Sequence, residues 1–354
     1  MIRGAIIGFG KIAQTGHVPA YLDADLRDKV QIVAVAEPNP AYRNRAATMF
    51  EAVHAYESVD QLLDRERIDF VDICTPPHTH GRLIKACAQK GLHILCEKPF
   101  VADVQEAREV AEFLSSRPEL VFMPCHQYRY SPIWRPFKDL VEASSGGNHN
   151  LLQFTVCRTQ ADPGFLAENP NWRTDQKISG GGILADTGVH YLYLVPWILG
   201  RPQALTAIVA NLHHQNIRVE DTAIVVIKCE RGIAEITLTW AADRRANSAR
   251  LVNHESSLVY NGTQLERARA GAVELLPVPD ASDKAQYVKL YVSLIDEFAR
   301  RVSGRQTDSE WVAEARQSIE LLHACYRSAS EKQTITFSET SLNSKRKVGA
   351  ALTK

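Results

Sequence analysis

The chain has 354 residues, of which 45% are hydrophobic and 23% charged, and its formal net charge is zero. A neutral chain has no general attraction to nucleic acid or to an anionic membrane surface, and we predict neither partner. No apolar run approaches the roughly 20 residues of a membrane span, so the apolar stretch 191–199 is interpreted as a buried helix.

Seven cysteines are scattered along the chain, and no C-x-x-C pair occurs. This odd number argues against a disulfide framework and against a structural zinc site. The adjacent His213 and His214 have no third ligand at a recognisable spacing, and we predict no metal. No basic segment followed by a cleavable apolar stretch opens the chain, so we expect a cytoplasmic protein.

The first 125 residues alternate short apolar strands with helical segments. The strands are expected at 5–7, 32–36, 70–74, 93–96 and 120–123, and the helices at 41–50, 59–64, 80–89 and 104–115. Continuous runs rich in Val, Ile and Leu suit parallel strands that are covered on both faces. The pattern predicts an α/β domain over residues 1–125, with a doubly wound parallel sheet of the Rossmann type.

The pattern changes after residue 129. Longer strands are expected at 151–159, 204–213, 222–229, 233–241 and 250–260, and helices at 285–302 and 310–328. Strands grouped apart from helices predict an α+β domain over residues 126–354, with a large, mostly antiparallel open sheet. Such a sheet leaves one face uncovered and normally finds a partner, so we expect a homodimer or homotetramer.

A glycine turn follows the first strand and opens a helix. Gly8, Phe9, Gly10, Lys11, Ile12 and Ala13 form a G-x-G-x-x-A motif in the setting where it binds a dinucleotide. The glycines permit the tight turn and the close approach of a pyrophosphate, which the helix N-terminus favours. The alternative is a glycine turn that only packs.

Glu37 ends the second strand, where a carboxylate bonds the ribose hydroxyls and repels a 2′-phosphate. This favours NAD. Arg43 lies nearby and could serve a phosphate, so NADP remains possible.

The segment 71–100 resembles the core signature of the Gfo/Idh/MocA oxidoreductases, which include glucose–fructose oxidoreductase and inositol dehydrogenase. The resemblance depends on Thr75-Pro76-Pro77, His80 and Glu97-Lys98-Pro99. It extends to the segments 17–20, 180–182, 186–190 and 220–222. It implies a Rossmann domain joined to an α+β domain whose sheet often mediates oligomerisation, and substrates that are sugars, inositols or related polyols.

The resemblance also implies roles for individual residues. Lys98 matches the catalytic lysine, His190 the catalytic histidine, and Asp186 the acid that precedes it. Some members use a tyrosine as the proton carrier, and Tyr191 keeps that alternative open.

These residue types suit the oxidation of an alcohol. Histidine titrates near neutrality and can carry the hydroxyl proton in both directions. Asp186 and His190 are four residues apart, and such residues share one face of a helix. Lys98 follows a strand at the edge where doubly wound sheets bind ligands, and its ammonium could bond the reacting oxygen. The alternatives are a surface lysine, a core histidine and an aspartate that caps the helix.

Two further groups complete the predicted site. Thr75, Pro76, Pro77, His80, Glu97 and Lys98 are expected on the nicotinamide side, although a proline-rich turn is also a common helix entry. His126, Arg129, Trp172 and Arg173 are expected to bind substrate, together with Lys98, Asp186 and His190. Surface ion pairs are the alternative for both arginines.

The sequence thus predicts an NAD(P)-dependent dehydrogenase or reductase that acts on a CH–OH group of a sugar, inositol or related polyol. The alternatives are a catalytically silent sugar sensor that retains the cofactor, a reductase of a non-sugar carbonyl or imine, and an enzyme that returns the hydride within each cycle.

Overall fold

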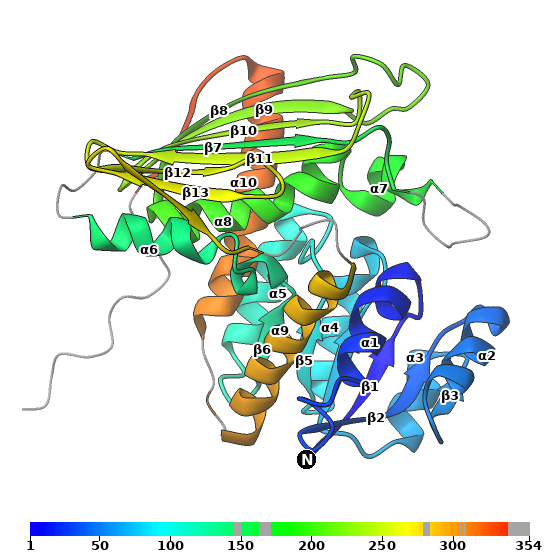
Figure 1. Ribbon diagram of the computed structural model, residues 1–354. Helices are drawn as coiled ribbons and strands as arrows, with labels where there is room; N and C mark the ends of the chain where they lie inside the picture. The colour runs from blue at the N-terminus through cyan, green and yellow to red at the C-terminus, as the bar shows by residue number, and fades with distance from the viewer. Residues whose placement is uncertain (145–149, 163–170, 279–283, 305, 307–308, 339–354) are drawn as a thin grey trace, which may run out of the picture.

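The N-terminal half contains a six-stranded parallel sheet. A computed structural model describes residues 1–144, 150–162, 171–278, 284–304, 306 and 309–338 (Figure 1). The strands are β1 (Ile2–Ile7), β2 (Val30–Ala36), β3 (His54–Tyr56), β4 (Phe70–Ile73), β5 (His93–Cys96) and β6 (Phe122–Pro124). Their order is β3-β2-β1-β4-β5-β6, which confirms the predicted doubly wound sheet. The sequence did not predict β3, because this three-residue edge strand has no buried residue to mark it.

Helices cover both faces of this sheet. They are η1 (Ala13–His17) with α1 (Val18–Tyr21), α2 (Pro40–Met49), α3 (Val59–Arg65), α4 (His80–Gln89) and α5 (Val104–Ser115). A late helix, α9 (Lys284–Gly304), packs against α1 and β1, and the Phe298 ring meets Phe70 edge-on at 5.3 Å. The C-terminal part of the chain therefore contributes to the core of the N-terminal sheet.

The second sheet has nine strands in the order β14-β13-β12-β11-β7-β10-β9-β8-β15. They are β7 (Asn150–Cys157), β8 (Pro202–Ala210), β9 (Thr222–Cys229), β10 (Gly232–Thr239), β11 (Ala246–Val252), β12 (Ser256–Tyr260), β13 (Leu265–Arg269), β14 (Ala272–Leu276) and β15 (Ile335–Thr336). Only the pairing of β7 with β10 is parallel among those described, so the prediction of a large, mostly antiparallel sheet is confirmed.

The prediction of a single strand over 250–260 was wrong. The Asn253 side chain accepts hydrogen bonds from the backbone N–H groups of Glu255 and Ser256, and this turn separates β11 from β12. The following hairpin of β13 and β14 was not predicted, because three of the five residues of β13 are charged and four of the five residues of β14 are exposed.

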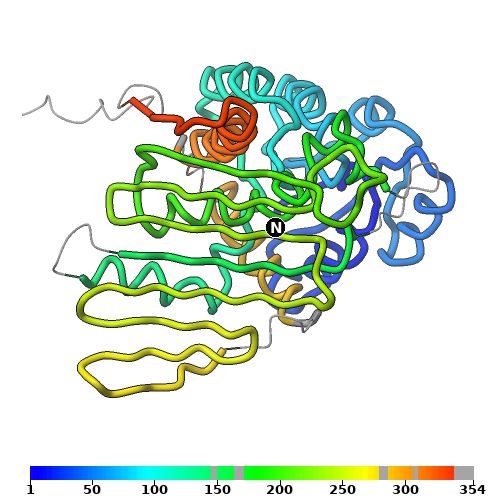
Figure 2. The backbone as a smooth tube through the Cα atoms, turned by 90° about the horizontal axis from the view of Figure 1, so that it is seen from above, coloured from blue at the N-terminus to red at the C-terminus, as the bar shows by residue number. Residues whose placement is uncertain are grey.

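Helices cover one face of the second sheet and leave the other open. Beneath the sheet in Figure 1 lie α6 (Arg135–Ala143) and α8 (Val189–Leu199), and α10 (Ser309–Glu331) packs against β8 near one edge. Figure 2, seen from above, shows the strands of the open face running side by side. That face carries exposed aliphatic side chains, among them Ile208 and its cross-strand neighbour Ile224. No helix among the described residues is long and apolar enough to cross a membrane.

Glu220 anchors the connection that leads into α8. This connection contains α7 (Gln176–Ser179), the three glycines 180–182 and the π-helical turn η5 (Leu184–Gly188). The buried Glu220 carboxylate accepts hydrogen bonds from the N–H groups of Gly182 and Leu184 and from the Tyr326 hydroxyl. A Cβ on Gly182 would lie 2.0 Å from the Glu220 carbonyl oxygen, so only glycine fits this approach.

We expect Glu220→Ala to lower the free energy of unfolding by about 2–4 kcal/mol, because two buried N–H groups lose their acceptor. Urea unfolding followed by fluorescence measures the change. Glu119→Ala, at an exposed position, serves as the control and is expected to stay within about 0.5 kcal/mol of the parent. Equal stability of both variants would contradict the anchoring role.

Candidate active site

The glycine turn has the geometry that a dinucleotide needs. Gly8 has φ +87°, and a Cβ there would lie 2.7 Å from Thr75 Cγ2. A Cβ on Gly10 would meet no atom within 4 Å, so the space above this residue is open. The helix that follows begins with a hydrogen bond from Gln14 N–H to the Gly10 carbonyl oxygen, and the first N–H groups of a helix favour an anion. These residues fit a pyrophosphate.

Glu37 lies directly against this turn. Its carboxylate accepts hydrogen bonds from the N–H groups of Phe9 (2.7 Å) and Asn39 (2.9 Å), and it is 7% exposed. The Arg43 guanidinium donates to the carbonyl oxygens of Glu37 and Pro38. The structure therefore places the acidic residue and the nearby cation at the end of β2, beside the turn.

His80 supports the loop that carries Lys98. Its ring nitrogens lie 2.8 Å from the Thr75 carbonyl oxygen and 2.9 Å from the Pro99 carbonyl oxygen, and the side chain is fully buried. Both ring nitrogens therefore hold backbone carbonyl groups of the loops around Lys98, and the contact of His80 with the nicotinamide side stays a prediction. Thr75, Pro76 and Pro77 stay predictions for the cofactor side.

Lys98 joins the two halves of the molecule. It follows β5, and its Nζ donates a hydrogen bond of 2.9 Å to the carbonyl oxygen of Asp186 in η5. The Asp186 carboxylate pairs with Arg173 Nε at 3.0 Å. Burial would raise the pKa of the Asp186 carboxyl, but the charges of Arg173 and Lys98 hold that pKa below its ordinary value. Asp186 is therefore an anion that forms no helix cap in the described structure.

His190 is held by two tyrosines. Its Nδ1 lies 3.0 Å from the Tyr193 hydroxyl oxygen, which accepts a hydrogen bond from the Tyr128 N–H, and the Tyr128 ring stacks on the imidazole at 4.2 Å. The Tyr193 oxygen accepts a hydrogen bond from the Tyr128 N–H, and the tautomer of His190 determines whether the hydroxyl donates to Nδ1 or Nδ1–H donates to the hydroxyl. Burial, and next the charge of Lys98, lower the pKa of His190 well below its ordinary value, so the imidazole is neutral.

Sequence analysis missed Tyr193 and Tyr128. The three-residue spacing of His190 and Tyr193 on one helix is the signal that could have identified the first. Tyr191, the alternative proton carrier, has a buried side chain whose ring lies 4.9 Å from Phe154 in the core. We infer that Tyr193, whose hydroxyl contacts Nδ1, orients the imidazole in place of Asp186.

Trp172 and Arg173 lie next to Asp186 and the glycine turn. The Arg173 guanidinium lies over the Trp172 ring and donates to the Asp162 carbonyl oxygen, and the Asp162 carboxylate pairs with Lys11 of the glycine turn. Trp172, Arg173, Asp186 and Lys98 therefore come together beside the cofactor turn.

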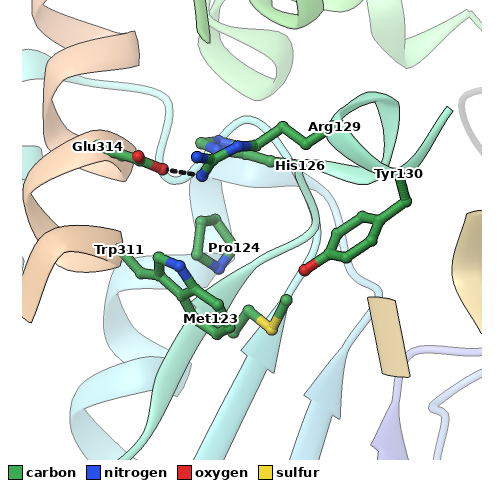
Figure 3. Close-up of a pocket in the computed structure, with 7 residues that line it drawn as sticks. All are labelled: Met123, Pro124, His126, Arg129, Tyr130, Trp311 and Glu314. Atoms are coloured by element: carbon green, nitrogen blue, oxygen red, sulfur yellow. Dashed lines mark hydrogen bonds and ion pairs between the residues drawn. The ribbon is translucent and has the colours of Figure 1, made fainter. Parts of the chain in front are cut away.

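The structure does not bring Arg129 to this group. Figure 3 shows its guanidinium paired with Glu314 of α10. His126 is buried and stacks on Tyr193 at 4.0 Å, so it supports the tyrosine that contacts His190. Burial lowers the pKa of His126 well below its ordinary value.

A buried network beneath Lys98 was also missed. His17 contacts Asp72 through Nδ1 at 2.6 Å and Glu97 through Nε2 at 2.9 Å, and Tyr291 of α9 donates to Glu97. Glu97 also accepts a hydrogen bond from the Lys98 N–H and so supports the Lys98 backbone, while its contact with the cofactor stays a prediction. Burial opposes the charge of His17, but the nearby Asp72 raises the pKa of the imidazole well above its ordinary value. Asp72 is 55 positions from His17, and no short motif connects them.

The fold and this set of side chains define an NAD-binding oxidoreductase. Residues 2–124 match the family described as oxidoreductases with an NAD-binding Rossmann fold, and residues 134–259 match the GFO/IDH/MocA C-terminal domain. The chain therefore belongs to the Gfo/Idh/MocA family, and its N-terminal domain binds NAD.

The similar curated proteins are oxidoreductases. An uncharacterized oxidoreductase of Synechocystis sp. is 24% identical over 276 residues, 74% of this chain and 72% of that protein. Levoglucosan dehydrogenase of Pseudarthrobacter phenanthrenivorans is 29% identical over 180 residues, 50% of this chain and 45% of that protein. D-Apiose dehydrogenase of Paraburkholderia graminis is 25% identical over 248 residues, 69% and 62% of the two chains. The match thus spans less than two thirds of the two named dehydrogenases.

Solved structures share the complete fold. Levoglucosan dehydrogenase in complex with NADH and levoglucosan has a TM-score of 0.83 at 20% identity, with 96% of this chain and 99% of that chain covered. A structure described as a putative myo-inositol dehydrogenase from Sinorhizobium meliloti has a TM-score of 0.78 at 23% identity, with 96% and 100% covered.

The His17 network predicts a dependence of stability on pH. A group whose pKa rises on folding stabilises the protein fully below its unfolded-state pKa, about 6.5 for histidine, and this contribution is lost as the pH rises through the folded-state pKa. We expect the difference in free energy of unfolding between the wild type and His17→Gln to be largest near pH 6 and to shrink toward alkaline pH. Urea unfolding between pH 6 and 10 measures it.

His323→Gln, on the exposed side of α10, is the matched control for the pH series. Its stability is expected to follow the wild type at every pH. A difference between His17→Gln and the wild type that is independent of pH would show that His17 is not charged in the folded protein.

Proposed function

We propose that the protein is an NAD(P)-dependent dehydrogenase that transfers a hydride between the nicotinamide and a secondary hydroxyl or carbonyl of a sugar, inositol or related polyol. The observation that carries the proposal is the convergence of Lys98, Asp186 and His190 beside the NAD-binding sheet. Relatives named as levoglucosan, D-apiose and D-glucoside 3-dehydrogenases support this class of substrate. Glu37 favours NAD, and Arg43 leaves NADP possible.

Lys98 stabilises the negative charge that develops on the reacting oxygen. The bound nicotinamide supplies the acceptor or donor of the hydride. An ammonium has three N–H donors, and within the described structure Lys98 uses one of them for the Asp186 carbonyl oxygen. Its other donors can bond the substrate oxygen as that oxygen becomes alkoxide-like. The anionic Asp186, fixed by Arg173, keeps a compensating charge next to Lys98.

His190 carries the proton, and Tyr193 allows both directions. When Nδ1–H donates to the Tyr193 oxygen, Nε2 is free to accept the hydroxyl proton, and the ring becomes an imidazolium. In the reverse direction the imidazolium returns this proton from Nε2 to the carbonyl oxygen, and the ring is neutral again. Because both Lys98 and His190 are present and close, we propose an enzyme and not a silent sensor.

We also propose a cytoplasmic homo-oligomer that forms through the open face of the second sheet. All seven cysteines are free, and six of them are buried. Ile208, Ile224, Val226 and Ile233 expose between 41% and 66% of their surface on neighbouring strands of that face. A second copy of the chain would cover this apolar surface and form a dimer or tetramer.

Lys98→Ala is expected to lower kcat at least about 100-fold, because the reacting oxygen loses a charged donor. The dissociation constant for NADH, measured by fluorescence titration, is expected to stay within about twofold, because the glycine turn is unchanged. Lys90→Ala, which removes an exposed lysine paired with Asp64, is the control. Turnover of Lys98→Ala at the wild-type rate with any true substrate would contradict the assignment.

Ile224→Glu is expected to convert the oligomer into a monomer, because it places a charge among the exposed aliphatic side chains of the open face. Sedimentation velocity measures the mass of each species. Leu22→Glu adds the same charge at an exposed position of the N-terminal half and is expected to leave the wild-type mass unchanged. A wild-type protein that sediments only as a monomer would overturn this part of the proposal.

A further inference from the structure

Arg158 interrupts the apolar face of β7. Along this strand Leu152, Phe154 and Val156 point toward the covered face, and each is at most 1% exposed. Arg158 is the next residue in this alternation, and its N–H still bonds the Thr239 carbonyl oxygen beside β10. Arg158 is 8% exposed. A cation therefore occupies a position where the two-residue alternation of the strand predicts a buried apolar residue.

The bonds of Arg158 hold its guanidinium without neutralising it. Its Nη1 donates to the carbonyl oxygens of Cys157 (2.7 Å) and Ala246 (3.3 Å) and to the side-chain oxygen of Asn247 (2.8 Å). All three acceptors are neutral. Within the described part of the chain Arg158 has no carboxylate partner, and its Nε and Nη2 have no acceptor. A buried cation of this kind is costly unless an anion completes its site.

The position of Arg158 connects it to the candidate active site. Phe154, on the same face of β7, contacts Tyr191, which meets the Tyr128 ring that stacks on His190. The charge of Arg158 is one of the causes, after burial, Lys98 and His126, that lower the pKa of His190. Arg158 and His190 therefore lie on the same side of the aromatic cluster that covers the candidate site.

A second cation lies beside Arg158. Arg245 is exposed in the turn between β10 and β11, and it too has no ion pair with a described carboxylate. Burial, and next the charge of Arg245, lower the pKa of Arg158. Arg173 pairs with Asp186, and Lys98 is the proposed partner of the reacting oxygen. Arg158 and Arg245 add positive charge for which the described part of the chain provides no carboxylate.

We propose that the substrate is an anionic sugar or polyhydroxy acid whose carboxylate or phosphate binds Arg158, with Arg245 at the entrance. This inference depends on the dehydrogenase function proposed above and specifies its substrate class. The fork of a guanidinium matches the two oxygens of either group, and a group already fixed by Asn247 loses little freedom on binding. The hydroxyl that reacts then lies between Lys98 and His190, at a distance from the anion.

The test uses matched sets of sugars that differ in one substituent. D-Glucose, D-glucuronate and D-glucose 6-phosphate, with the corresponding D-galactose set, are assayed by reduction of NAD and of NADP. We expect the wild type to use an anionic member at least about tenfold better in kcat/KM than its neutral counterpart. Comparison of the carboxylate and phosphate arms identifies the anion.

Arg158→Gln is expected to lower kcat/KM for the preferred anionic sugar about 10–100-fold, mainly through KM, and to lower it much less for the neutral sugars. Arg158→Lys is expected to retain part of the preference, because it keeps the charge without the fork. Arg250→Gln, on the exposed side of β11, is the matched control. Equal losses for neutral and anionic sugars in Arg158→Gln would show a structural role and overturn the inference.

The two proposals can fail separately. Turnover of neutral sugars alone would overturn the anionic substrate and leave the dehydrogenase intact. If no sugar reduces either cofactor, thermal unfolding in the presence of NADH and each sugar tests whether an anionic sugar binds at Arg158. A rise in Tm with an anionic sugar that is absent in Arg158→Gln would support the anion site while counting against the proposed reaction. No rise with any anion would overturn the inference.

Discussion

The hydrogen bond from the Lys98 ammonium to the Asp186 carbonyl oxygen is the contact on which the rest of the site depends. It joins residues that are 88 positions apart, one at the edge of the parallel sheet and one in the turn that begins α8. Each end has its own support. Glu97 holds the Lys98 backbone from below, and Glu220 fixes the glycine connection that leads to Asp186. These two buried carboxylates place the ammonium before any ligand arrives, and such preorganisation lowers the cost of charge stabilisation.

Burial and aromatic packing then determine how the imidazole behaves. Tyr128 stacks on His190, and Tyr193 contacts its Nδ1, so the ring has one orientation and two accessible tautomers. Nearby cations lower the pKa of His190, which keeps the ring neutral and able to exchange a proton. One of the cations that lower the pKa of His190 is Arg158, and the described part of the chain provides no carboxylate to pair with it. The positive field of the site therefore serves both the proton carrier and, in our proposal, the recognition of an anionic substrate.

The residues that could be predicted from sequence are those whose function depends on local spacing. The glycine turn and the Glu97-Lys98-Pro99 segment follow strands directly, and strand periodicity placed most of both sheets. Residues whose function depends on long-range contacts were missed or misassigned. His17 and Asp72 are 55 positions apart, Arg129 is neutralised by Glu314 from a late helix, and the short edge strand β3 buries no residue. These contacts form only when distant segments pack together, so no local pattern in the sequence could predict them.

The most direct measurement is an experimental structure of the protein with its nicotinamide cofactor and a non-reacting analogue of an oxidised sugar. The account predicts that one oxygen of the analogue lies within about 3.2 Å of both Lys98 Nζ and His190 Nε2, next to the reactive carbon of the nicotinamide. An analogue bound elsewhere, or a cofactor whose nicotinamide lies away from both side chains, would contradict the account.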